Sequence, residues 1–261
     1  PRSRVQAELD NNALQREKMG HYLPAMWQFD GEWFWALDRL EYLLPKLLKW
    51  GALEADNSLL NFEPKHARLP TANAAQLDFY FSFRSPYSYL AAAYVLKQHK
   101  NWPVTVNVKP VLPMAMRGLP VPAAKRLYIV RDVKRTADKE GTPFGRIADP
   151  IGAGAERALT VFNLCQGSEQ QLKFLAAASR AAFAEHQDLA SDAGLLYATR
   201  QAGLDDTAAL AKLKQGLDLK LAEQNRQDLQ QEGLWGVPCW KLGELVTWGY
   251  DRRWMIEAQL Q

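Results

Sequence analysis

A run of aromatic and apolar residues that leads directly into a proline constrains the fold of this chain most. Residues 77–83 read LDFYFSF, a pattern typical of a buried strand. Residues 84–88 read RSPYS, and helical spacing continues to residue 98. Pro86 suits the first turn of that helix, because the N–H group that proline lacks would have no partner there. A second short strand, VTVNVK at 104–109, predicts a strand–helix–strand unit.

The rest of the chain adds helices and then a hairpin. Residues 113–232 predict a mainly helical segment that prolines and glycines interrupt. Residues 238–242 and 245–247 predict a hairpin, and a last helix is expected from about Asp251. This order predicts an α/β fold with helices on a small mixed sheet and a helical insertion.

The N-terminal residues repeat the C-terminal pattern at a constant offset of 213 positions. Six residues recur with the same identity: Asn12, Gly20, Trp27, Trp35, Asp38 and Arg39 match Asn225, Gly233, Trp240, Trp248, Asp251 and Arg252. Two unrelated hairpin–helix units with similar turn residues are the alternative explanation. The repeat favours a truncated copy of the C-terminal fold at residues 1–50, containing a helix, a hairpin and a last helix.

The domain organisation follows from that repeat. Residues 51–76 are expected to be a linker, and residues 77–261 a complete domain with its insertion at about 113–232. The chain is then interpreted as a fragment of a longer tandem-domain protein. We expect the first unit to be structural and to pack against the second domain or a companion segment. A homodimer is also left open.

Composition excludes several classes of partner. A net charge of +3 over 261 residues does not indicate nucleic-acid or membrane binding. No apolar stretch approaches the roughly 18 residues that span a bilayer, and a cytoplasmic location is expected. The two cysteines, Cys165 and Cys239, form no zinc-like or disulfide pattern, and the four histidines form no cluster. We therefore expect no metal.

Ser85 is the first candidate for chemistry. It precedes Pro86, where its hydroxyl would point at the free N–H groups of the helix N-terminus. The positive end of the helix dipole stabilises a thiolate or another anion at that place. A serine before a proline is also a good helix cap that needs no further function. The residues alone leave both explanations open.

Three separated motifs carry a resemblance to a known family. FYFSFRSPYSYLA at 79–91 resembles the opening of 2-hydroxychromene-2-carboxylate isomerases and kappa-class glutathione transferases, in the DsbA-like thioredoxin superfamily. Their Ser-Pro-Tyr-Ser tetrad stands where redox-active members carry Cys-x-x-Cys. GVP at 236–238 resembles the Val–cis-Pro element, and WGYDR at 248–252 resembles the closing motif. The resemblance covers residues 77–261 and implies a thioredoxin-like fold.

The resemblance implies roles for individual residues. Ser85 would hydrogen-bond the glutathione sulfur and favour its thiolate. Val237 would pair its backbone with the cysteinyl part of glutathione, held by a cis Pro238. Asp251 would meet the amino group of the γ-glutamyl end, beside Tyr250. The bound thiolate would add reversibly to a small unsaturated substrate of pyruvate or aromatic type, which is isomerase or transferase-like chemistry.

Further residues are predicted to line the cleft, and some depart from the family pattern. These are Tyr87, Ser88, Asp149, Pro150 and Cys239. Asp149 would add negative charge near an anionic tripeptide, and Tyr250 could crowd the glutamyl site. Two alternatives to the glutathione-dependent enzyme remain open. One is a catalytically inactive binding module, and the other is a single-cysteine oxidoreductase that uses Cys239.

Overall fold

The computed structural model describes residues 2–54 and 75–260, which fall into two compact units. Within the described residues, unit 1 comprises 2–54 and 121–132, and unit 2 comprises 75–120 and 133–260. Most of the predicted linker at 51–76 lies outside the described residues.

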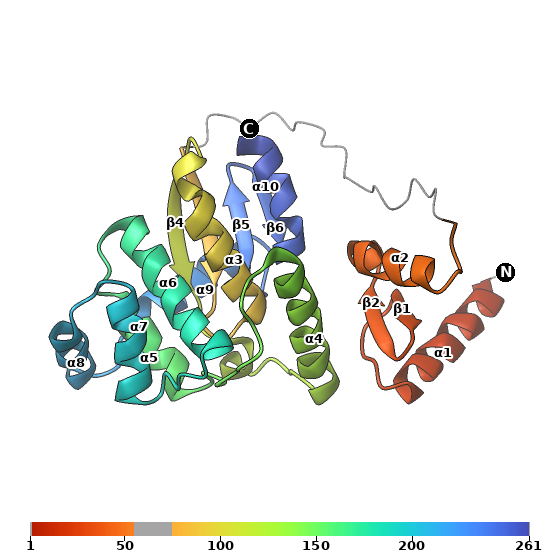
Figure 1. The fold of residues 1–261 in the computed structure, drawn as a ribbon, viewed down its shortest axis with the longest axis horizontal. Helices are drawn as coiled ribbons and strands as arrows, with labels where there is room; N and C mark the ends of the chain where they lie inside the picture. The colour runs from red at the N-terminus through yellow and green to blue at the C-terminus, as the bar shows by residue number, and fades with distance from the viewer. Residues whose placement is uncertain (1, 55–74, 261) are drawn as a thin grey trace. The chain divides into compact units, whose positions relative to one another are not determined.

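Unit 2 is built on a four-stranded mixed sheet in the order β4-β3-β5-β6 (Figure 1). Strand β3 (Gln76–Phe81) runs parallel to β4 (Thr105–Pro110) and antiparallel to β5 (Cys239–Leu242). Strand β6 (Leu245–Trp248) closes the hairpin with β5. Helix α3 (Pro86–Gln98) connects β3 to β4, which confirms the predicted strand–helix–strand unit.

The predicted helical insertion is present. Helix α4 (Ala123–Glu140) belongs to unit 1 up to Asp132 and to unit 2 beyond it. Helices α5 and α7 contact α6, and α8 lies beyond them against α5 and α7 (Figure 1). The bounds of the remaining helices are α5 (Ala153–Phe162), α6 (Gly167–Ala184), α7 (Asp192–Gln201), α8 (Asp206–Lys214), α9 (Lys220–Gln231) and α10 (Arg253–Leu260). Two short 3₁₀ turns, Met114–Arg117 and Tyr250–Arg252, precede α4 and α10.

Strand β3 is buried on both of its faces, as its run of aromatic residues predicts. Side chains alternate along a strand, so Phe79 and Phe81 share one face. There Phe79 stacks on Trp240 at 4.6 Å between ring centroids, and Phe81 packs on Phe162 of α5. On the other face Tyr80 lies in a core cluster with Val111, Leu229 and Cys239. The two cores fix the end of β3, where the candidate site begins.

Unit 1 contains a helix, a hairpin and a second helix. Helix α1 (Arg2–Lys18) precedes strands β1 (Met26–Phe29) and β2 (Glu32–Trp35), which form a two-stranded sheet. A 3₁₀ turn (Leu37–Arg39) then leads into α2 (Leu40–Lys49).

The interior of unit 1 is held by apolar burial and by one buried ion pair. Phe34, Leu43, Leu44 and Tyr128 are buried hydrophobic residues of this unit. The Arg39 guanidinium donates from Nε to both carboxylate oxygens of Asp132 at 2.8 Å, and both side chains are buried. A bidentate pair of this kind holds the start of α2 against the first part of α4 within the unit.

The element boundaries differ slightly from the sequence expectations. The strand predicted at 77–83 is Gln76–Phe81, because Ser82 accepts the N–H of Ser85 and the chain turns there. The last helix begins at Arg253 rather than Asp251, because a 3₁₀ turn precedes it.

Candidate active site

Ser85 caps the N-terminus of α3, and its hydroxyl faces a second loop. The Ser85 Oγ accepts the N–H of Ser88 at 3.1 Å, and Pro86 occupies the first turn as predicted. The same hydroxyl donates to the Val237 carbonyl oxygen at 3.4 Å. Ser85 is partly exposed. The capping contact and the contact with residue 237 therefore converge on one oxygen at the positive end of a helix.

The loop opposite Ser85 carries the predicted cis proline. Among the described residues, only the Val237–Pro238 peptide bond is cis. The Pro238 carbonyl accepts the N–H of Gly249 at 2.9 Å. Gly249 has φ +104°, and a Cβ added there would clash with the Asp251 carboxylate. Gly249 thus contacts the proline loop through its N–H and lies beside the Asp251 carboxylate.

Arg84 contributes an ion pair that the sequence did not predict. Its Nε and Nη2 donate to the two carboxylate oxygens of Asp149 at 2.7 and 2.8 Å. The sequence predicts that Asp149 opposes an anionic ligand, but the Arg84 guanidinium offsets its charge. The neighbouring Pro150 is buried, and its carbonyl accepts the N–H of Ala155 in α5. Asp149 is exposed, whereas Pro150 is buried.

The other two members of the tetrad differ in exposure. Ser88 is fully buried, and its Oγ accepts the N–H of Ser82 at 3.3 Å. Its hydroxyl therefore joins the end of β3 to α3 rather than opening to solvent. Tyr87 is partly exposed. Of these two, only the Tyr87 side chain is placed where a ligand can reach it.

The Tyr250 side chain points into the protein. It is 3% exposed, its hydroxyl donates to Glu140 at 2.5 Å, and the Arg253 guanidinium lies 4.2 Å from the ring centroid. Burial raises its pKa well above the ordinary value for tyrosine. The expectation that Tyr250 crowds the glutamyl site does not fit this geometry, because the ring packs between α4, α10 and Tyr94.

Cys239 also lies away from the cleft. Its side chain is fully buried in the cluster with Tyr80 and Leu229, and its thiol donates to the Gly236 carbonyl at 2.8 Å. Burial raises its pKa far above the usual range, so thiolate is disfavoured. Strand β5 directs Cys239 to the face opposite Trp240, which explains why a residue next to Pro238 misses the site. Burial also raises the pKa of Cys165 to about 12.

Two tryptophans and an arginine surround the proline loop and were not predicted as site residues. Trp235 and Trp248 have ring centroids 5.8 Å apart. A Cβ on Gly236 would lie 2.7 Å from the Trp248 Nε1, so glycine is needed for this close approach. Arg117 donates to the Trp235 carbonyl at 2.6 Å. The sequence signals for these two tryptophans were the position of Trp235 beside the GVP motif and the place of Trp248 at the start of the WGYDR motif.

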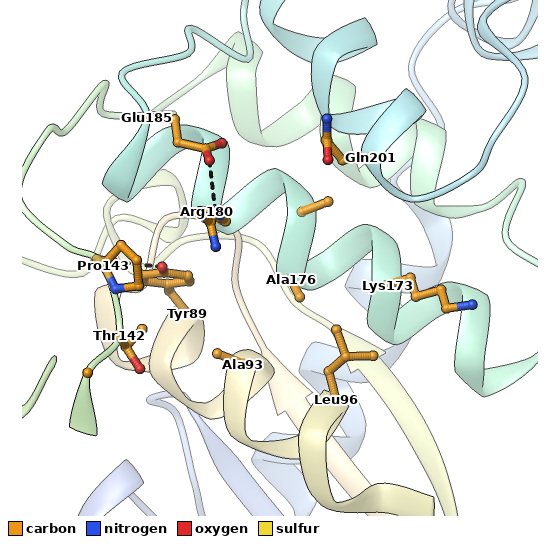
Figure 2. A pocket seen from close by; sticks show the side chains of 12 residues that line it. Tyr89, Ala93, Leu96, Thr142, Pro143, Lys173, Ala176, Arg180, Glu185 and Gln201 are labelled. Atoms are coloured by element: carbon orange, nitrogen blue, oxygen red, sulfur yellow. Dashed lines mark hydrogen bonds and ion pairs between the residues drawn. The ribbon is translucent and has the colours of Figure 1, made fainter.

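A separate cavity of about 590 Å³ opens between α3 and α6 (Figure 2). Tyr89 and Arg180 line it, and neither Ser85 nor Val237 does. In Figure 2 the Tyr89 hydroxyl donates to the Pro143 carbonyl, and Arg180 pairs with Glu185, each at 2.7 Å. Burial raises the pKa of Tyr89 to about 12. Tyr89 and Arg180 are thus each already paired with another residue of the lining.

Within residues 2–54 and 75–260, His, Cys, Asp and Glu side chains form no group of three or more that could hold a metal ion. No described helix has both the length and the apolar character to cross a membrane.

The sheet order, the connecting helix α3 and the cis-proline loop define a thioredoxin-like fold with a serine at the head of its first helix. The chain belongs to the DSBA-like thioredoxin domain family, whose model matches residues 76–261. This finding confirms the family that the three sequence motifs predicted.

Individual relatives agree with that assignment. The chain is 24% identical to a 2-hydroxychromene-2-carboxylate isomerase of Pseudomonas putida over 194 residues, which cover 70% of this chain and 93% of the relative. A solved 2-hydroxychromene-2-carboxylate isomerase matches with a TM-score of 0.60 and 23% identity, over 70% of this chain and 93% of that one. A probable DsbA oxidoreductase from Streptomyces coelicolor matches with a TM-score of 0.50 and 16% identity, covering 70% and 89%. These structural matches establish the fold.

Proposed function

We propose that this chain is a glutathione-dependent isomerase or transferase-like enzyme in which Ser85 activates the glutathione thiol. One observation carries the proposal. The Ser85 hydroxyl sits at the N-terminus of α3 and directly faces the carbonyl of Val237 before the cis proline. A thiol bound between these two elements would meet a hydrogen-bond donor and the positive end of a helix dipole.

Both groups act on the protonation of that thiol. A free cysteine thiol has a pKa near 8.5, so only a few per cent is thiolate at neutral pH, and a helix N-terminus lowers that pKa. When the Ser85 hydroxyl rotates from the Val237 carbonyl to the sulfur, it donates a hydrogen bond to the charged form. The 3.4 Å contact with Val237 is long for an O–H···O hydrogen bond, so little is lost in the exchange.

The rest of the tripeptide would be held by groups already close to the proline loop. The backbone of Val237 would pair with the cysteinyl residue as a short added strand. Asp251, placed beside Gly249, would bind the γ-glutamyl ammonium group. The pair of Arg84 and Asp149 would leave the cleft without the net negative charge that repels glutathione.

The chemistry would be an isomerisation with a borrowed nucleophile. The thiolate would add to the double bond of a small unsaturated pyruvate-type or aromatic-type substrate, which becomes a single bond free to rotate. Expulsion of the thiolate then restores the double bond in its new geometry, so no oxidant or reductant is consumed. The isomerase relatives support this class of reaction. A need for reduced glutathione would suit the cytosol.

Two other functions were considered from the sequence, a binding module and a single-cysteine oxidoreductase. Because the Ser85 hydroxyl both accepts and donates within the chain, it also satisfies the requirements of a simple helix cap in a binding module. A single-cysteine oxidoreductase using Cys239 is opposed by the complete burial of that thiol and its raised pKa.

Calorimetric titration of glutathione into the full chain and into Ser85→Ala tests the proposal. We expect binding with proton release near neutral pH in the natural chain. Loss of a hydrogen bond to a charged sulfur would weaken binding in Ser85→Ala by roughly tenfold to a hundredfold. The matched control is Ser191→Ala, because Ser191 caps α7 through Gly194 at 3.0 Å in the same way.

The control separates loss of a cap from loss of a ligand contact. Both substitutions should lower stability by about 1 kcal/mol, but only Ser85→Ala should change glutathione affinity and proton release. Absence of binding at millimolar glutathione would contradict the proposal and leave the binding module. Equal affinity in the two variants would contradict the role of Ser85.

A further inference from the structure

The two hairpin–helix segments share geometry as well as sequence. Every cross-strand pair of β1 and β2 has a counterpart in β5 and β6 at the same offset of 213, for example Trp27–Phe34 and Trp240–Thr247. The turn glycines Gly20 and Gly233, which follow α1 and α9, have φ values of +79° and +74°. The correspondence therefore extends from the first helix through the hairpin.

Two hydrogen bonds are also repeated. The Trp27 Nε1 donates to the Ala36 carbonyl at 3.0 Å, and the Trp240 Nε1 donates to the Gly249 carbonyl at 3.1 Å. The Ala36 N–H donates to the Ala25 carbonyl at 2.8 Å, as the Gly249 N–H does to Pro238 at 2.9 Å. The position of β1 within unit 1 is thus the position of β5 within a thioredoxin-like sheet.

The two strands differ in what lies on their second edge. Strand β5 pairs with both β6 and β3, whereas among the described residues β1 pairs only with β2. Antiparallel pairs alternate, so the bond between Ala25 and Ala36 turns the backbone of Trp27 toward β2. Met26 and Gln28 then turn their N–H and C=O groups toward the open edge. This edge can accept another strand.

The side chain beside that edge is exposed where its counterpart is buried. Trp27 is 50% exposed, whereas Trp240 is 1% exposed because Phe79 of β3 stacks on it. The same indole makes the same hydrogen bond to its own turn in both units. The difference in burial therefore comes from the absent neighbour strand and not from a different orientation.

Helix α1 provides a second, independent observation, because two of its residues are exposed where their counterparts in α9 are buried. Asn225 of α9 is buried and donates to the carbonyl of Pro110 at the end of β4 at 2.9 Å. Its counterpart Asn12 is exposed. Leu9 is 58% exposed, whereas its counterpart Ala222 is 2% exposed. Within residues 2–54 and 75–260, therefore, no strand like β4 covers the face of α1 that contains Leu9 and Asn12, just as none like β3 pairs with β1.

We propose that β1 and the Leu9–Asn12 face of α1 form a docking surface for a strand–helix–strand segment of a thioredoxin-like chain. The segment would have the pattern of residues 76–110. Its first strand would add antiparallel to β1 with an aromatic residue opposite Trp27. The end of its second strand would offer a carbonyl to Asn12. In residues 76–110 of this chain, β3 already pairs with β5, and Pro110 already accepts a hydrogen bond from α9. A different segment is therefore needed to cover β1 and α1.

Hydrogen–deuterium exchange of the full chain tests this docking surface. The probe is a segment with the sequence of residues 76–112, fused to a soluble carrier protein. We expect the backbone amides of β1 to exchange at least about tenfold more slowly with the probe, because strand addition protects them. Exchange in β5 should stay unchanged. A probe with Phe79→Asp should protect β1 much less, since it lacks the aromatic partner of Trp27.

A matched pair of chain variants examines the edge itself. Gln28→Pro removes an N–H that faces outward and none that faces β2, so it should abolish protection while the hairpin remains. Gln28→Thr keeps that N–H and should behave as the natural chain does. Absence of protection by the probe, or equal protection in Gln28→Pro, would overturn the proposal. Protection of β1 that rises with chain concentration alone would assign the surface to a second copy and also overturn it.

Discussion

The hairpin of β1 and β2 and the hairpin of β5 and β6 have the same local structure but different surroundings. Both place an indole N–H on the carbonyl just beyond the second strand. Only the second hairpin has a neighbour strand, and only there is the tryptophan buried. The comparison teaches that turn residues and local hydrogen bonds determine the shape of such a unit, whereas burial and its energy depend on segments that are distant in sequence.

The Asp-Arg dipeptide that follows each hairpin gives the same lesson. Arg39 is buried and pairs in bidentate fashion with Asp132 of α4. Its counterpart Arg252 is partly exposed, and its Nη1 lies 3.9 Å from Asp251. Identical residues at equivalent positions therefore make different contacts. In unit 1 the arginine pairs with α4, and in unit 2 the carboxylate of the neighbouring aspartate lies beside Gly249.

Truncation of the two equivalent tryptophans should give the largest contrast. Trp240→Ala removes a fully buried indole and should lower the stability of unit 2 by about 3–5 kcal/mol. Trp27→Ala removes a half-exposed indole and should cost unit 1 about 1 kcal/mol. Hydrogen exchange in urea, followed in β3 for unit 2 and in β2 for unit 1, measures each loss. Equal losses would break the comparison.

The equivalent asparagines should give an intermediate contrast. Asn225→Ala leaves the buried Pro110 carbonyl without its donor and should cost about 1–3 kcal/mol. Asn12→Ala replaces an exposed residue in α1 with a better helix former and should change stability by less than about 0.5 kcal/mol. Urea denaturation of both variants provides the measurement. A large loss for Asn12→Ala would show that Asn12 already has a buried role within this chain.

Ala36 and Gly249, which follow β2 and β6, should give the smallest changes in stability, and the two changes should have opposite signs. Ala36 has φ +45°, a conformation that an L side chain rarely adopts and that glycine adopts readily. Ala36→Gly should therefore stabilise unit 1 by about 1 kcal/mol. The reciprocal Gly249→Ala should destabilise unit 2, because its Cβ would meet the Asp251 carboxylate. Thermal unfolding of the two variants checks both signs.

Local patterns were sufficient to predict most of the fold. The aromatic run of β3 is dense because both of its faces are buried, and that density is visible in the sequence. Pro86 marked the start of α3, and two short apolar runs around Gly243 marked the last hairpin. These signals are local, so they did not require knowledge of how the insertion folds.

The candidate site was only partly predictable, because several of its contacts are long-range. Ser85 and Val237 were predicted as partners through the family motifs, and their side-chain to backbone contact spans 152 positions. Nothing in the sequence indicated that Arg84 would pair with Asp149, since the course of the insertion brings them together. Tyr250 and Asp251 are adjacent in a 3₁₀ turn, where successive side chains point in different directions, and the sequence does not say which one faces inward.

The serine at position 85 also has a consequence for how the protein tolerates oxidative stress. A dithiol at the same helix terminus would pass through sulfenic acid and disulfide forms when peroxide rises. A serine hydroxyl is not oxidised in this way, and the thiol of Cys239 is buried in the core. The helix terminus at position 85 therefore keeps one chemical form where a dithiol would change with the redox conditions.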